Sequence, residues 1–268
     1  MTARTIIQIT DRGDPRIAPF IGVRERDLTG GADGRFIVEG KVPLSILLTQ
    51  SRFEVESLFL CETRLAPLAT LLQDVPKDVP IYTAPQTLMD EIAGFPIHRG
   101  ILACARKGSQ MDLSAILSGQ RILVLNQLSN HDNVGAAFRN AAAFGVDGII
   151  LDSQSCDPLY RKAIRVSSGA SLWLPFHHGG RGEDHVSALK AEGFAVWAMT
   201  PRTDAAALHA QPVPDKLAIV LGAEGPGLPD GLIAAAHPVR IPMSPGFDSV
   251  NVATAGAIAL AHVFSAQH

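Results

Sequence analysis

The strongest constraint on the fold is a series of short apolar runs in the second half of the chain. Five of them recur after residue 120: RILVLN, GIILD, FAVWAMT, LAIVLG and VRIPM. Runs of this kind are typical of strands that are buried on both faces of a parallel sheet. Stretches with helical character separate or follow them, at 134–144, 158–168, 183–192, 229–236 and 251–266. The alternation predicts a doubly wound α/β domain with a mostly parallel sheet.

A second, smaller set of alternating elements precedes this domain. RFIVEG, VESLFLCE, VPIYTA and GILACAR have the pattern of strands, and helices are expected after Lys41, over 64–72 and over PQTLMDEIAGF, which ends at Gly94. The sequence therefore predicts a small α/β domain at 1–106, a linker with one helical turn at 107–120 and the larger domain at 121–268. A length of 268 residues fits two domains.

Composition excludes several classes of protein. Hydrophobic residues make up 47% of the chain and charged residues 18%, which predicts a packed core rather than disorder. The net charge of −3 argues against a uniformly basic nucleic-acid-binding surface, although a local patch would suffice. Cys61, Cys104 and Cys156 are odd in number and far apart, unlike a disulfide framework or a zinc knuckle. The histidines lack HExxH spacing, so no metal site is expected.

The sequence also bears on location. The first twenty residues lack the apolar core and small-residue cleavage site of a signal peptide. No uninterrupted apolar run reaches membrane-spanning length. These features predict a soluble cytoplasmic protein.

Polar or glycine-rich segments follow three of the predicted strands. RILVLN continues into QLSNHDNVGAAFR, LAIVL into GAEGPG, and VRI into PMSPGFDSVN. Open parallel sheets bind their ligands at the carboxyl ends of the strands, so these segments are the candidate site. They contain neither a P-loop nor the GxGxxG turn of dinucleotide-binding proteins. The pattern indicates a ligand-binding architecture of another kind.

Arg139 is the notable residue of the first segment. Three and four positions away lie only Gly135, Ala136, Ala142 and Ala143, so no intrahelical ion pair explains it. Its guanidinium either binds an anion such as phosphate or reaches water at the surface.

The other two segments can also be interpreted without a functional role. The glycine-rich turn at 222–229 is either a ligand contact or a tight turn with a solvated Glu224. Ser249 and Asn251 either shape a site or only cap the next helix. That helix is apolar on nearly all sides until His262, which predicts burial in a core or a subunit interface.

In this order and spacing, the three segments resemble the three signature motifs of the SpoU (TrmH-like) family of RNA ribose methyltransferases, in the SPOUT superfamily. Asn133 and Arg139 fall in the NxGxxxR frame of the first motif, Glu224 at the acidic position of the second, and Ser249 and Asn251 in the S(L)N frame of the third. Residues 35–106 resemble the substrate-binding domain that often precedes this catalytic domain and is similar to a ribosomal-protein fold. The resemblance covers most of the chain.

Two positions depart from the family pattern. Asn130-His131 replaces the usual Asp-Pro of the first motif, and Val250 replaces the common Leu of the third. Neither change removes a candidate catalytic residue, but the first bears on the edge of the motif that would face RNA.

The resemblance implies more about the fold than the periodicity does. It implies a deep trefoil knot in the carboxyl-terminal part of the larger domain, a feature otherwise nearly absent from proteins. It also implies a homodimer with the active site near the subunit boundary. The expected reaction transfers a methyl group from S-adenosylmethionine to a ribose 2′-hydroxyl of structured ribosomal or transfer RNA, without a metal.

The resemblance also implies the site residues. The catalytic set is Asn133, Arg139, Glu224, Ser249 and Asn251. The cofactor is expected to lie against Gly222, Ile241 and Val250, with Thr200 and Met243 near the adenosine. Valine at position 222 is expected to block the cofactor and leave the chain folded. Arg139 is the family's proposed activating residue, but an arginine stays protonated and is a poor base, so phosphate binding and charge stabilisation are an alternative role.

Two other functions fit the sequence less well. A catalytically silent RNA-binding protein of the same fold is disfavoured by the intact catalytic set, and a nucleotide-dependent oxidoreductase by the missing fingerprint loop. Arg161, Lys162 and Arg165 lie together on one predicted helix and either contact RNA phosphates or form a solvated face.

Overall fold

The computed structural model describes residues 5–23, 34–97 and 99–267. Residues 1–4, which begin the segment expected not to be a signal peptide, lie outside the described part. The chain forms two compact units, Met1–Ser109 with Leu159–Trp173, and Gln110–Pro158 with Leu174–His268. Residues 159–173 thus group with the first unit, although the sequence assigned them to the larger domain. None of the described helices is long and apolar enough to cross a membrane.

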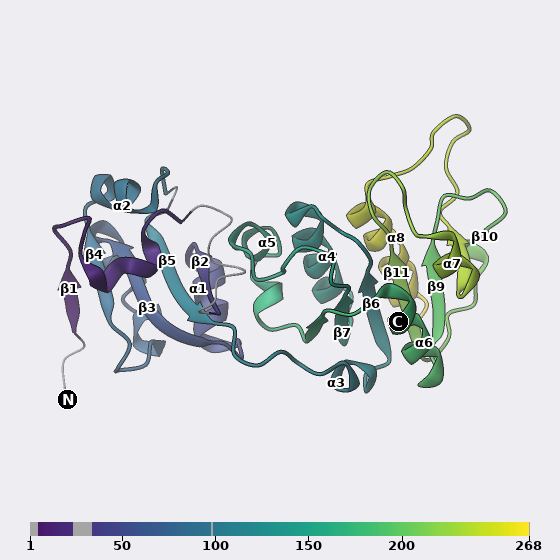
Figure 1. Cartoon of the computed structure of the whole chain (residues 1–268), viewed down its shortest axis with the longest axis horizontal. Helices are drawn as coiled ribbons and strands as arrows, with labels where there is room; N and C mark the ends of the chain where they lie inside the picture. The colour runs from purple at the N-terminus through teal and green to yellow at the C-terminus, as the bar shows by residue number, and fades with distance from the viewer. Residues whose placement is uncertain (1–4, 24–33, 98, 268) are drawn as a thin grey trace. The chain divides into compact units, whose positions relative to one another are not determined.

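The first unit is built on a mixed five-stranded sheet (Figure 1). Its order is β1 (Ile6–Gln8), β4 (Ile81–Ala84), β3 (Glu54–Cys61), β5 (Ile101–Arg106) and β2 (Arg35–Glu39). β1, β4 and β3 are parallel, whereas β5 is antiparallel to both of its neighbours. The unit is the expected small α/β fold, with β1 as a strand that the sequence reasoning missed.

Helices and 3₁₀ turns complete this unit. They are η1 (Pro15–Phe20), α1 (Lys41–Thr49), η2 (Glu62–Arg64), η3 (Ala66–Leu68), η4 (Leu71–Asp74), α2 (Gln86–Ala93), α5 (Arg161–Val166) and η5 (Ala170–Leu172). The helix predicted over 64–72 is wrong, because the chain forms three short turns there. Pro67 lies in the middle of that stretch and cannot donate the hydrogen bond that a continuous helix requires. Phe20, Phe59 and Met89 belong to the buried cluster that joins η1 and α2 to the sheet.

Arg161 of α5 has a buried partner that the sequence did not indicate. Its guanidinium forms an ion pair with Glu39 of β2, and both side chains are largely buried. It also lies over the ring of Phe95, with 4.3 Å between the guanidinium carbon and the ring centroid. Arg165 is half exposed, with its Nη1 atom 3.7 Å from Glu39 Oε2. Glu39, from a distant part of the sequence, therefore neutralises Arg161, which fits neither the phosphate contact nor the solvated face that the sequence left open.

The second unit contains a seven-stranded sheet in which all pairs are parallel. Its order is β10 (Ala206–Ala207), β12 (His237–Arg240), β9 (Ala195–Met199), β11 (Leu217–Leu221), β6 (Arg121–Leu125), β7 (Gly148–Leu151) and β8 (Phe176–His178). This confirms the expected parallel sheet. The short edge strands β8 and β10 were not predicted, and β12 ends before Ile241, so the IPM sequence belongs to a loop.

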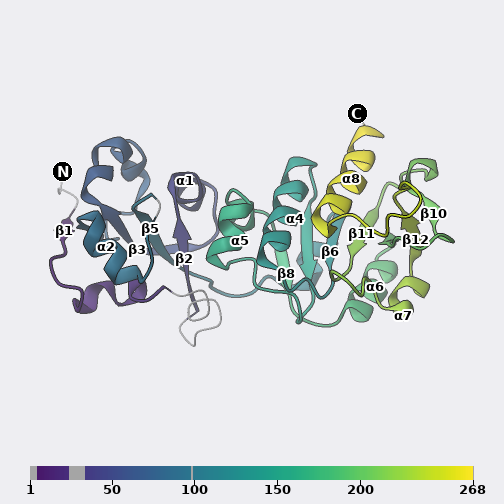
Figure 2. The same ribbon diagram turned by 90° about the horizontal axis from the view of Figure 1, so that it is seen from above.

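Helices cover both faces of this sheet. They are α3 (Leu113–Leu117), α4 (His131–Ala143), α6 (Gly182–Ala191), α7 (Asp230–Ala234) and α8 (Val252–Ser265), together with the turn η6 (Leu208–Ala210). Figure 2 shows α4 and α8 on one side of the strands, and α6 and α7 on the other. The core beneath α6 and α7 contains Leu189, Val220 and Leu232. α4 begins at His131, three residues earlier than expected, because Asn130 caps it by accepting a hydrogen bond from the Asp132 N–H.

Asp152 joins two of the loops at the carboxyl end of this sheet. It follows β7 and is 2% exposed. Its Oδ1 atom accepts hydrogen bonds from the backbone N–H groups of Gln127 and Ser155, each at 2.9 Å, and from the Ser155 hydroxyl at 2.7 Å. Gln127 has a φ of 60°, a strained conformation for a residue other than glycine. The carboxylate therefore helps to hold the loop that leads into α4.

Replacing this carboxylate tests its structural role. Asp152→Ala leaves the buried donors without their acceptor and is expected to lower the free energy of unfolding by about 3 kcal/mol. Urea unfolding followed by circular dichroism measures the change. Asp204→Ala, at a carboxylate whose side chain is 80% exposed, serves as the control and should change stability by less than about 0.5 kcal/mol. Equal unfolding midpoints for the two variants would contradict the role assigned to Asp152.

Candidate functional site

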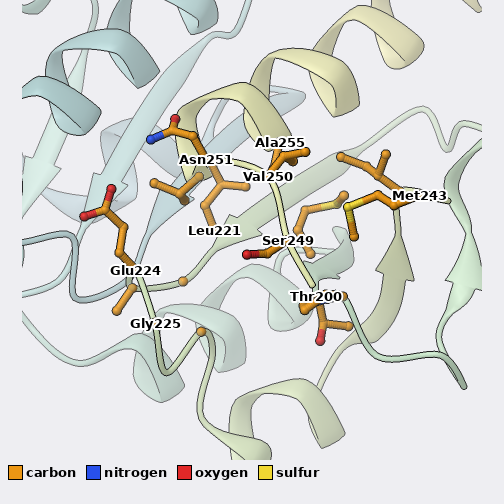
Figure 3. A pocket seen from close by; sticks show the side chains of 16 residues that line it. Thr200, Leu221, Glu224, Gly225, Met243, Ser249, Val250, Asn251 and Ala255 are labelled. Atoms are coloured by element: carbon orange, nitrogen blue, oxygen red, sulfur yellow. The ribbon is translucent and has the colours of Figure 1, made fainter. Parts of the chain in front are cut away.

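A pocket of about 340 Å³ lies where β9, β11 and β12 end. Its walls are residues 199–201 after β9, 221–225 and 227 after β11, part of the 241–250 loop after β12, and the start of α8 (Figure 3). Because neighbouring parallel strands end at the same edge of a sheet, the segments that follow β9, β11 and β12 meet although they are far apart in the sequence. The pocket is therefore at the edge that the sequence pattern indicated.

The five residues expected to contact a cofactor all line this pocket: Thr200, Gly222, Ile241, Met243 and Val250. Figure 3 shows Thr200 and Met243 on the walls that β9 and the 241–250 loop contribute. Ala255 also lines the pocket from the first turns of α8 and was missed by the sequence reasoning. The only signal for it was a small residue one turn after Asn251.

Gly222 is needed for a reason that the sequence did not reveal. A Cβ atom at this position would lie 2.5 Å from the Leu228 nitrogen and 2.6 Å from the carbonyl carbon of Gly227. A side chain here would thus displace the backbone of the 222–228 turn itself. The expectation that valine at 222 blocks the cofactor in an otherwise unchanged protein conflicts with this packing, so position 222 is a poor place to test the pocket.

Three of the proposed catalytic residues are joined by side-chain hydrogen bonds. Asn133 lies in the first turn of α4, is 6% exposed and donates a hydrogen bond from Nδ2 to Glu224 Oε1. Its Oδ1 atom accepts a hydrogen bond of 3.0 Å from Asn251 Nδ2. Asn251 also caps α8, because its Oδ1 atom accepts from the N–H groups of Ala253 and Thr254 at 2.9 and 3.2 Å. Asn251 is thus both a cap and a member of this network.

The remaining two candidates occupy different positions. Ser249 lines the pocket beside Val250 (Figure 3). Arg139 is exposed on α4, outside the pocket lining. Within the described parts of the chain it has neither an ion pair nor a side-chain hydrogen bond. The structure therefore places Glu224, Ser249 and Asn251 in the pocket wall, bonds Asn133 to two of them, and leaves the guanidinium of Arg139 free to bind another molecule.

The pocket lining carries little charge. Among the described residues that line it, Glu224 alone carries a charge, and the remaining walls are mostly apolar or backbone. In residues 5–23, 34–97 and 99–267, no group of three or more His, Cys, Asp or Glu side chains is arranged to hold a metal ion. The pocket suits an amphipathic organic ligand with a positive charge near Glu224.

The departure at Asn130-His131 changes little in this region. Asn130 performs the capping that an aspartate would perform, and His131 occupies the first helical position. The helix start is therefore preserved, and Asn133 keeps its place in the first turn.

Comparison with known proteins agrees with this arrangement. Residues 120–261 match the profile of the SpoU rRNA methylase family. An uncharacterized tRNA/rRNA methyltransferase of Mycobacterium bovis is 37% identical over 260 residues, which cover 94% of this chain and 89% of that protein. The 23S rRNA (guanosine-2′-O-)-methyltransferase RlmB of Photobacterium profundum is 30% identical over 74% of this chain and 83% of its own length.

A solved structure shares the fold over nearly the whole chain. The S-adenosylmethionine-bound rRNA methyltransferase of Sinorhizobium meliloti superposes with a TM-score of 0.79 at 19% identity, covering 96% of this chain and 97% of that one. The match of the family profile to more than half of the residues, together with the Mycobacterium relative, settles the assignment. The chain belongs to the SpoU rRNA methylase family.

Proposed function

We propose that this protein transfers the methyl group of S-adenosylmethionine to the ribose 2′-hydroxyl of a nucleotide in ribosomal or transfer RNA. The family and the named activities of the relatives support both the cofactor and the class of substrate. The observation that carries the proposal is the pocket at the ends of β9, β11 and β12, with the Asn133–Glu224–Asn251 network beside it.

The residues of the pocket fit the cofactor. A volume of about 340 Å³ falls in the range of small-molecule sites. Met243 and Thr200 line the pocket and are assigned to contact the adenosine, and the backbone of the 222–225 turn is assigned to approach the ligand closely. The single carboxylate, Glu224, favours a positively charged ligand. When bound, S-adenosylmethionine supplies an electrophilic methyl group on a sulfonium.

The protein must then position the hydroxyl and stabilise the charge that develops on its oxygen. Arg139 is suited to both tasks, because its guanidinium can hold an RNA phosphate and remain cationic during the reaction. Asn133 and Asn251 orient Glu224 and the start of α8, and Ser249 contributes a hydroxyl to the pocket wall. We assign Arg139 to phosphate binding and charge stabilisation rather than to proton removal.

Arg139 provides the direct test of this mechanism. Arg139→Ala is expected to lower kcat by about a hundredfold to a thousandfold, the usual cost of losing one strong electrostatic contact to a transition state. Affinity for S-adenosylmethionine, measured by calorimetry, should stay within about twofold because Arg139 does not line the pocket. Arg181→Ala removes another arginine, with a side chain 75% exposed, and is the control expected to retain activity.

The pH dependence of Arg139→Ala separates the two roles of the arginine. If Arg139 stabilises charge without taking the proton, kcat of the parent and of the variant should depend on pH in the same way, whereas loss of a proton acceptor would remove an ionisation from the profile of the variant. A folded variant that methylates RNA within about threefold of the parent rate would rule out the mechanism.

The cofactor assignment is tested by filling the pocket from α8. Ala255→Leu places a branched side chain in the pocket wall and is expected to weaken binding of S-adenosylmethionine at least tenfold without unfolding the chain, because Ala255 is only half-buried. Ala261→Leu makes the same change on the same helix outside the pocket lining. Calorimetry that finds equal affinities for the two variants would place the cofactor elsewhere.

A homodimer is part of the proposal. α8 exposes Ile258 and Phe264 to the extent of 39% and 37%, and the Phe264 ring also contacts Phe144, so Ile258 is the exposed apolar side chain of this helix that lacks such a ring contact within the described residues. Leu260, by contrast, is 5% exposed and belongs to the core of its own unit, so a charge there would unfold the chain instead of separating subunits. Ile258 is therefore the position at which a substitution tests the dimer.

Light scattering tests the dimer. Ile258→Asp should shift the protein from dimer to monomer at micromolar concentration, because an unpaired charge is costly inside an apolar interface. Val42→Asp introduces the same charge at another exposed apolar residue, on α1, and should leave the mass unchanged. A monomeric parent protein would contradict the dimer directly.

The proposal includes a knot and separate roles for the two domains. A trefoil knot in the carboxyl-terminal part is proposed from the resemblance to the family; α8 returns after β12 to pack against β11 and α4. Residues 1–106 are assigned to binding RNA, 107–120 to the linker and 121–268 to methyl transfer. A cytoplasmic location stays a prediction.

Binding of S-adenosylmethionine with no methyl transfer to any RNA would favour the alternative of a silent RNA-binding protein.

A further inference from the structure

Two asparagines attach α4 to the beginning of α8. Asn133 Oδ1 accepts a hydrogen bond from Asn251 Nδ2, and Asn140 Nδ2 donates one to the carbonyl oxygen of Ala253, both at 3.0 Å. Seven residues are about two helical turns, so the two asparagines extend from the same face of α4. The first bond joins residues of the proposed catalytic network. The second has no role in the mechanism described so far.

Asn140 acts on the turn that forms a wall of the cofactor pocket. The N–H of Ala253 is held by Asn251 Oδ1 at 2.9 Å, and its carbonyl is held by Asn140. Asn251, Val252 and Ala255 all line the pocket on either side of Ala253. The bond from Asn140 therefore ties α4 to the segment of α8 that would touch the cofactor.

Asn140 also directly follows Arg139. Because Arg139 has no side-chain partner within the described residues, the location of its guanidinium depends on how α4 is held. A shift of about 1 Å in a group that serves a reaction can cost about a hundredfold in rate. Asparagine is a poorer helix former than alanine, and the half-buried amide of Asn140 costs free energy unless it is hydrogen-bonded. The Ala253 carbonyl supplies the hydrogen bond that Asn140 needs.

We propose that Asn140 is a positioning residue that fixes α4 to the first turn of α8 and thereby places Arg139 relative to the cofactor pocket. The inference rests on the proposed function, in which Arg139 serves methyl transfer. Asn140 makes no contact with substrate in this role. It acts through the backbone of α4, and it links the wall of the cofactor pocket to the helix that carries the catalytic arginine.

The first measurement separates turnover from binding. Asn140→Ala is expected to lower kcat about tenfold, which is ~1.4 kcal/mol in the barrier. Affinity for S-adenosylmethionine and the KM for RNA should each stay within about twofold. Asn140→Gln, which keeps an amide donor, should recover most of the lost kcat. A control at the other end of the same helix pair is Phe144→Leu, which weakens the ring contact with Phe264, whose centroids lie 6.1 Å apart. Phe144→Leu should leave kcat within about twofold.

A double-mutant cycle decides whether Asn140 acts through Arg139. In an Arg139→Ala background there is no guanidinium left to position, so adding Asn140→Ala should change kcat by less than about twofold. A further tenfold loss in that background would overturn the inference, because Asn140 would then act independently of Arg139. If Arg139→Ala alone has no effect, the proposed mechanism fails instead, and the two failures are distinguishable.

Folding of each variant is checked by circular dichroism. Should Asn140→Ala not fold, Asn140→Asp takes its place in the cycle, since it keeps the shape of the side chain and replaces the donor with a carboxylate that faces the Ala253 carbonyl. Unchanged kcat in a folded Asn140→Asp variant would equally overturn the inference.

Discussion

The parallel pairing of β9, β11 and β12 is the constraint on which the site depends. β11 pairs with β9 and with β6, and β9 pairs with β12, all in the same direction. Strands that share a direction also share an edge at which their loops emerge, so Thr200, Gly222 and Ile241 become neighbours without any contact in the sequence. The apolar side chains that bury the sheet on both faces therefore also bring together the walls of the pocket.

The buried amide of Asn133 links this edge to the helices above it. A polar group with 6% exposure is costly unless its donor and acceptor are both used. Glu224 and Asn251 use them, one from the turn after β11 and one from the start of α8. One side chain on α4 thus fixes two loops that the sheet alone brings only near each other. This rigidity suits a reaction that requires a hydroxyl, a methyl group and a cation in line.

Two residues that suggested chemistry have packing roles that the sequence did not reveal. Gly222 is required because the turn that follows it passes within 2.5 Å of where its Cβ would be. Arg161, which belonged to an apparent basic patch, is neutralised by Glu39 and covers Phe95. In both cases tertiary packing sets the neighbour. The turn at 227–228 explains why position 222 must be glycine, and Glu39 accounts for the charge of Arg161.

The sequence by itself determined the succession of elements, the parallel sheet and the identity of the three motifs, because buried strands and capped helices leave local patterns in composition. It could not locate the short edge strands β8 and β10, whose two or three residues carry too little pattern, nor the break at Pro67 among apolar neighbours. It named Asn133, Glu224 and Asn251 but not the hydrogen bonds among them. Only the tertiary structure decided those bonds, the pairing of Asn140 with Ala253 and the neutralisation of Arg161. Each joins residues that are about a hundred positions apart in the sequence, and only folding brings their atoms within hydrogen-bonding distance.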